Sequence, residues 1–219
     1  MKRIRLIVPL LFLAACANKK NDIGKDVKQI LKDTITIVKH DTVYYDHDDW
    51  QEGFKLSHDP DEDSVWGKPV KYYIENPNCS PIATAFYEGQ FRPTDSRATS
   101  MLLSLVTTND NKLRPFYRWC LNKTIIIQDG ALAEYTGVPA RQYAEKFPDE
   151  FFEYMDFDTT GDKYNDWVGS IEYSGFYDED DYKKPADIRK RLIRAMTAHC
   201  KNLNAKMKKR IDKFALDCF

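Results

Sequence analysis

The stretch LRPFYRWCLNKTIII, residues 113–127, decides the fold. One set of its side chains recurs at the i, i+3, i+4, i+7, i+8 spacing of an amphipathic α-helix. These residues are Leu113, Phe116, Tyr117, Cys120, Leu121 and Thr124. Pro115 suits the first turn of such a helix, where its missing N–H is tolerated, and Gly130 is well placed to end it. The stretch therefore predicts a helix with one face in a hydrophobic core.

Helical patterns continue on both sides of this stretch. They cover residues 94–106, 132–135, the segments that begin at Pro139 and Pro148, residues 164–171, and 185–218 with a break at 202–204. Gly137 is expected to end the short helix at 132–135. Residues after 66 show no convincing strand pattern. Residues 66–219 are therefore predicted to form an all-α domain, an irregular bundle of six to eight helices.

The start of the chain has the layout of an export signal. Lys2, Arg3 and Arg5 precede the apolar run at residues 6–13, which is shorter than the roughly 20 residues that span a bilayer. The sequence Leu13-Ala14-Ala15-Cys16 follows. Together these residues resemble the signal peptide and lipobox of bacterial lipoproteins.

That resemblance implies a lipid anchor. Residues 1–15 would be removed, Cys16 would carry a diacylglyceryl thioether, and the lipid would hold the protein on a membrane. Ala17, in place of an Asp that retains lipoproteins in the inner membrane, implies the outer membrane. No acidic run of the kind used for surface export follows Cys16 directly, so we expect the periplasmic side.

Residues 16–65 are expected to form a flexible, extended tether behind the lipidated cysteine. Residues 33–38 and 41–45 have similar sequences that are rich in β-branched residues, and such residues favour extended backbone. The tracts at 46–49 and 58–63 are acidic and poor in core residues, which is typical of loops or disorder.

Charge is distributed unevenly along the chain. Residues 129–181 contain 15 Asp and Glu against 3 Lys and Arg, whereas residues 183–219 contain 12 Lys and Arg against 3 Asp. The two segments either pack side by side and neutralise each other, or form a polarised surface for a charged partner. The net charge of the whole chain is −1, which gives no general attraction to nucleic acid.

Four cysteines remain beside Cys16. They are Cys79, Cys120, Cys200 and Cys218. An even number in an exported chain predicts two disulfides, with a free buried thiol at Cys120 as the alternative. Their spacing does not resemble a zinc site. The loop at 156–162 resembles the start of an EF-hand, but Trp167 stands where the loop needs its final Glu. We expect neither a metal nor a cofactor.

Motifs for catalysis are lacking, with no GxSxG, HExxH or phosphate loop. His199, beside Cys200, is expected to be buried and hydrogen-bonded. Carboxylates near aromatic residues could still form a catalytic pair. They are Glu134, Glu145, Glu150 and Glu153.

The best candidate for a binding surface is the loop at 177–182, because Tyr amid charged residues makes a good interface anchor. Its residues are Tyr177, Asp178, Glu179, Asp180, Asp181 and Tyr182. The leading interpretation is a non-enzymatic, protein-binding lipoprotein, such as an immunity or inhibitor protein that blocks a basic toxin or enzyme. Two alternatives stay open: a cell-wall or glycan-binding lipoprotein with weak carboxylate-based hydrolysis, and a structural envelope lipoprotein.

Overall fold

The computed structural model describes residues 64–219, and the predicted signal peptide, Cys16 and the predicted tether up to residue 63 lie outside them. Within this range the predicted all-α domain is confirmed. The α-helices are α3 (Lys71–Ile74), α4 (Pro81–Tyr87), α5 (Arg97–Ser104), α6 (Arg114–Ile127), α7 (Gly130–Lys146), α8 (Pro148–Asp156), α9 (Asp162–Ser174), α10 (Pro185–His199) and α11 (Ala205–Cys218). Two 3₁₀ turns, Leu105–Thr107 and Asp181–Lys183, complete the helical structure.

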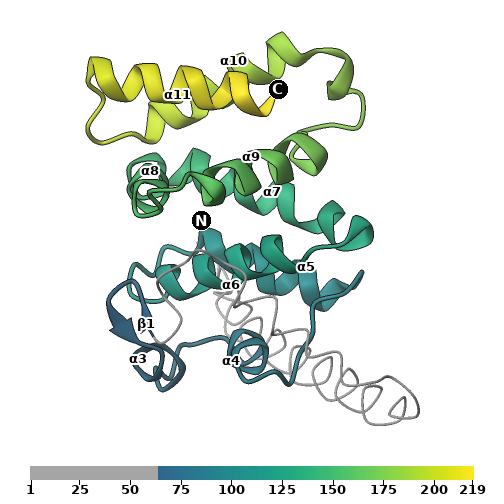
Figure 1. The fold of residues 1–219 in the computed structure, drawn as a ribbon, viewed down its shortest axis with the longest axis vertical. Coiled ribbons are helices and arrows are strands. Elements are labelled where there is room, and N and C mark those ends of the chain that lie inside the picture. The colour runs from purple at the N-terminus through teal and green to yellow at the C-terminus, as the bar shows by residue number, and fades with distance from the viewer. Residues whose placement is uncertain (1–63) are drawn as a thin grey trace, which may run out of the picture. The chain divides into compact units, whose positions relative to one another are not determined.

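The helices of this domain stack in layers (Figure 1). α7 and α9 pack more extensively against each other than any other pair. α5 and α6 contact this pair on one side, while α10 packs on α7 and α11 on α9. Among residues 64–219, no helix is both long enough and apolar enough to cross a membrane.

The helix predicted from residues 113–127 is the most deeply buried one. Pro115 lies in the first turn of α6, as predicted, and the side chains of Phe116, Cys120 and Leu121 are fully buried. The predicted end is wrong, because α6 stops at Ile127 and Gly130 begins α7. Asp129 caps that next helix by accepting a hydrogen bond from the Leu132 N–H at 2.9 Å.

The structure has nine α-helices between residues 64 and 219 instead of six to eight. Two short helices, α3 and α4, were not predicted. A minimal hairpin also precedes α3, with β1 (Ser64–Val65) antiparallel to β2 (Lys68–Pro69). Its two turn residues, Trp66 and Gly67, have φ values of 53° and 69°, as a two-residue type I′ turn requires.

One helix, α7, replaces two predicted ones. Gly137 and Pro139 both lie inside it, although they were expected to end one helix and start another. Gly137 is there because α9 comes too close for a side chain. A Cβ at this position would lie 2.4 Å from the Ser170 carbonyl oxygen and 2.6 Å from the Gly175 nitrogen.

Ser174 of α9 also forms hydrogen bonds with the backbone of α7 at this point. The Ser174 hydroxyl accepts a hydrogen bond from the Gly137 N–H at 3.0 Å and donates one to the Ala133 carbonyl at 2.6 Å. In a regular helix the Gly137 N–H would donate to the Ala133 carbonyl four residues earlier, and the Ser174 hydroxyl bridges these two groups. Tertiary contact therefore supports the helix where its local sequence would break it.

The contact at Gly137 leads to a stability prediction. Gly137→Ala should destabilise the domain by about 1–3 kcal/mol, because the new methyl group meets backbone atoms that have no room to move. The matched control is Gly169→Ala, in the middle of α9, where a Cβ meets nothing within 4 Å. The control should be stabilising by about 0.5–1 kcal/mol, because Ala is the better helix former. Urea unfolding followed by circular dichroism measures both; equal effects would contradict the close approach.

Candidate functional site

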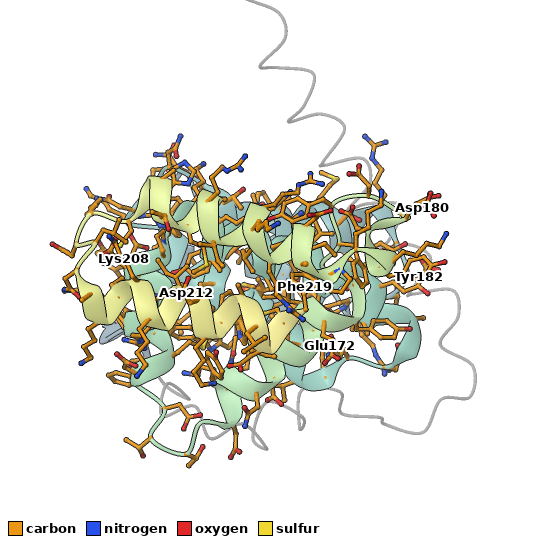
Figure 2. All side chains as sticks on the ribbon, turned by 90° about the horizontal axis from the view of Figure 1, so that it is seen from above. Glu172, Asp180, Tyr182, Lys208, Asp212 and Phe219 are labelled. Carbon is orange, nitrogen blue, oxygen red and sulfur yellow. The ribbon has the colours of Figure 1, made fainter. Side chains whose placement is uncertain are left out.

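The loop at 177–182 connects α9 to α10 at one end of the α10–α11 layer. In Figure 2, the labelled Asp180 and Tyr182 lie at this end, and Lys208 lies at the opposite end of the layer. The loop thus places acidic and aromatic side chains far from the turn that joins α10 to α11.

Tyr177 fixes the base of the loop. Its ring lies between two guanidinium groups, with the Arg141 carbon 3.7 Å and the Arg191 carbon 4.0 Å from the ring centroid. Its hydroxyl donates a hydrogen bond to the Glu145 carboxylate. Burial, reinforced by that carboxylate, raises the pKa of Tyr177, so the ring stays neutral. Each such cation–π contact contributes about 0.5–2 kcal/mol.

Two of the loop's carboxylates, Asp178 and Asp181, also fix the base of the loop. Arg191 donates to Asp178 at 3.1 Å and to Asp181 at 3.3 Å. Asp181 also accepts the backbone N–H of Asp178 at 3.1 Å, which closes the turn. These interactions neutralise part of the loop's charge inside the domain.

The remaining three residues form the exposed tip of the loop: Glu179, Asp180 and Tyr182. All three are exposed, and Tyr182 keeps 61% of its surface accessible. Asp180 has a 2.7 Å ion pair with Lys183, but both side chains are largely exposed, and such pairs contribute little. The structure thus separates the six predicted residues into a fixed base and an exposed tip.

The sequence did not reveal how many cations the core contains. Arg118 of α6 is 2% exposed, and its guanidinium carbon lies 3.9 Å from the Tyr154 ring centroid and 4.4 Å from that of Trp66. It also donates a hydrogen bond to the Tyr143 hydroxyl at 3.0 Å. The one available signal was the i, i+4 spacing of Arg114 and Arg118 within a helix that is mostly apolar.

Two of the four carboxylates considered for catalysis are already held by arginines. Arg114 makes a two-point contact with Glu150, from Nε at 2.8 Å and from Nη2 at 2.6 Å. Arg141 donates to both carboxylate oxygens of Glu145 at 2.9 Å. These carboxylates join helices or hold the loop base.

His199 is exposed, so the prediction that it is buried is wrong. It ends α10, and its Nδ1 lies 2.9 Å from the Glu145 carbonyl oxygen. Cys200 follows it and donates to Asp149, 3.7 Å away. Asp149 also accepts the N–H of Lys201 at 2.8 Å, so it fixes the turn after α10.

The predicted disulfides are absent: Cys79, Cys120, Cys200 and Cys218 are all free thiols. Geometry explains this for the last two. The chain does turn back between them, but Cys200 lies at the turn and Cys218 at the far end of the 14-residue helix α11. That helix is about 21 Å long at 1.5 Å per residue, and a disulfide needs Cα atoms within about 7 Å.

The loop that resembles the start of an EF-hand is held by hydrogen bonds from backbone N–H groups to the side chain of Asp158. Asp158 is buried and accepts hydrogen bonds from the Thr160 and Lys163 N–H groups, both at 2.9 Å. Although burial raises the pKa of Asp158, these hydrogen bonds outweigh it and lower the pKa overall. Asp158 thus satisfies the Lys163 N–H in the first turn of α9, whose N-cap residue is Gly161.

The acidic and basic segments do pack side by side, as the first of the two interpretations predicted. Besides the Arg191 contacts, Arg210 of α11 donates to Asp156 of α8 at 2.9 Å. Neutralisation is incomplete, however. Lys201, Lys206, Lys208 and Lys209 are exposed and form no salt bridge with another residue of 64–219.

Comparison with known proteins adds nothing to this picture. The chain matches no protein-family model, and neither a curated protein nor a solved structure matches it.

The free thiols should be detectable by labelling. In a chain with Cys16→Ser, we expect maleimide to modify the half-buried Cys79 and Cys200 in the native protein, and Cys120 and Cys218 only after unfolding. Burial raises the pKa of Cys79, and of Cys200 together with the charge of Asp149. Because the thiolate is the reactive form, their labelling should accelerate at higher pH than that of an ordinary thiol. Mass spectrometry without reductant counts the labels; a protein that accepts them only after reduction would contradict the structure.

Proposed function

We propose that this protein is a lipoprotein, anchored through Cys16 at the periplasmic side of the outer membrane, whose helical domain binds a protein partner. The binding site is the exposed tip of the loop, Glu179, Asp180 and Tyr182. The observation that supports this most is the contrast between the tip and its base. Arg141 and Arg191 hold the ring of Tyr177, while Tyr182 projects with 61% of its surface exposed.

A loop with a fixed base is suited to recognition. Because its conformation is already ordered, binding loses less conformational entropy than it would with a loose loop. Tyr is among the residues that most often dominate binding energy. Two adjacent carboxylates favour a basic partner, since charge complementarity speeds association and rejects acidic surfaces.

A concrete form of this proposal is an immunity or inhibitor protein. A basic secreted toxin or enzyme is the kind of partner whose site an acidic, aromatic tip could cover. The membrane anchor would keep the inhibitor in the compartment where such a partner acts.

A second candidate is binding to cell-wall glycan. The exposed aromatic residues favour it, because Tyr173 at the end of α9 and Tyr182 in the loop keep 55% and 61% of their surface accessible. Tyrosine rings can serve as stacking platforms for sugar rings. Sedimentation with purified peptidoglycan separates this candidate from protein binding.

The proposal predicts that changing the tip abolishes partner capture. We expect the triple variant Glu179→Gln, Asp180→Asn and Tyr182→Ala to lose at least about tenfold in affinity, as interface hot spots do. The full-length protein is used as bait on envelope extract of the source organism, and captured proteins are identified by mass spectrometry. Binding is then quantified with each purified partner.

The matched control carries the same kinds of change elsewhere. Glu75→Gln, Glu88→Gln and Tyr72→Ala alter exposed residues of α3 and α4 and their flanks, and Tyr72 keeps 45% of its surface accessible. This variant should capture the partner like the wild type. If the tip variant and the control capture the same proteins equally well, the loop is not the binding site.

A further inference from the structure

The turn between α10 and α11 bears the strongest unneutralised charge of the domain. Residues 188–211 contain nine Lys and Arg and no Asp or Glu. Arg191 and Arg210 contact the acidic segment beneath them, as described above. We define the basic turn as the four remaining exposed lysines around the turn, Lys201, Lys206, Lys208 and Lys209.

The position of these lysines is unfavourable for the helix that carries them. α11 begins at Ala205, so Lys206 lies in its first turn and Lys208 and Lys209 lie in the next, and the first turn has no acidic residue. The N-terminal end of a helix has a partial positive charge that repels cations. Lys206 and Arg210 are also like charges at i, i+4, as are Lys209 and Lys213, and like charges at this spacing repel each other. Lys208 has Asp212 at i+4 but forms no salt bridge with another residue of 64–219.

Because Lys206 and Lys209 disfavour α11, and none of the four lysines forms a salt bridge with another residue of 64–219, folding does not explain their concentration. Arg191 and Arg210, by contrast, stabilise the fold through their ion pairs with Asp178 and Asp156. An external anionic partner explains the lysines, because it would compensate the repulsion that the folded chain leaves unbalanced.

We propose that the basic turn binds the anionic phospholipid headgroups of the leaflet that holds the lipid anchor. This rests on the proposed anchor at Cys16, which lies 48 positions before Ser64. A chain of that length can extend to at most about 170 Å, so the domain can reach the leaflet. Lipid binding at this turn would direct the acidic tip, at the other end of the layer (Figure 2), away from the membrane and toward a soluble partner.

The residue types favour a membrane over nucleic acid. Lysine is a compact, strongly hydrated charge suited to diffuse attraction, whereas arginine provides the two-point contacts used on phosphates and bases. Residues 200–210 contain no aromatic side chain on which a base could stack. A polybasic patch in addition to a lipid anchor is a common second signal for stable membrane attachment.

The test uses residues 16–219 with Cys16→Ser, so that no lipid contributes. This protein should sediment with vesicles of phosphatidylglycerol and phosphatidylcholine, but not with phosphatidylcholine alone. Binding should disappear near 1 M salt, where the Debye length is about 3 Å. Lys206→Gln, Lys208→Gln and Lys209→Gln together should weaken binding by about 100-fold, at about fivefold for each lysine.

The control changes the net charge equally at a distant place. Lys68→Gln, Lys71→Gln and Lys112→Gln alter exposed lysines near α3 and before α6, and should leave vesicle binding within about twofold of the wild type.

The basic-turn variant should unfold at a temperature no lower than the wild type, because the repulsion between like charges in α11 is relieved. Equal loss in both variants, or no binding to anionic vesicles, would overturn the proposal. The proposal would also be overturned if the wild type binds soluble polyglutamate but no vesicles, and the basic-turn variant loses the polyglutamate binding. That result would assign the lysines to an acidic protein. Since the anchor is absent throughout, failure here is distinct from failure of the anchor itself.

Discussion

The close approach of α7 and α9 at Gly137 is the constraint on which the rest of the domain depends. With no side chain at Gly137, the Ser174 hydroxyl can bridge the Gly137 N–H and the Ala133 carbonyl. This contact sets where α9 ends and hence where the loop toward α10 begins. α10 then packs on α7 and α11 on α9, so the positions of the acidic tip and the basic turn both follow from this pair of helices.

Cations above aromatic rings connect this frame to the rest of the core. Arg118 is buried between Tyr154 and Trp66, and Tyr177 is held between two arginines. A buried cation is costly unless it has suitable partners, and an aromatic face supplies one without a second charge. The same interaction thus stabilises the interior and fixes the base of the loop, leaving the tip available.

Sequence periodicity predicted α6 well, because its apolar face repeats over the whole helix. It failed at α7, where Gly137 and Pro139 resemble helix breakers, and only the contact with α9 shows why Gly137 is there. Charge counts left open whether the two segments neutralise each other or form a polarised surface. Which lysines stay exposed depends on the packing of α10 and α11. The cysteine count was misleading for a similar reason, since pairing depends on distances that spacing alone does not give. For the loop at 177–182, composition identified the segment but could not separate base from tip.

Both proposed binding surfaces have meaning only if the domain is held at a membrane, so the anchor is the central claim. Intact mass spectrometry of the protein purified from the envelope tests it most directly. We predict a chain that begins at Cys16 and carries the added mass of a diacylglyceryl group and its acyl chains. We also predict that Cys16→Ser no longer sediments with washed membranes. An unlipidated chain that begins at Met1 or at another residue, or a Cys16→Ser variant that stays in the membrane fraction after a high-salt wash, would contradict the account.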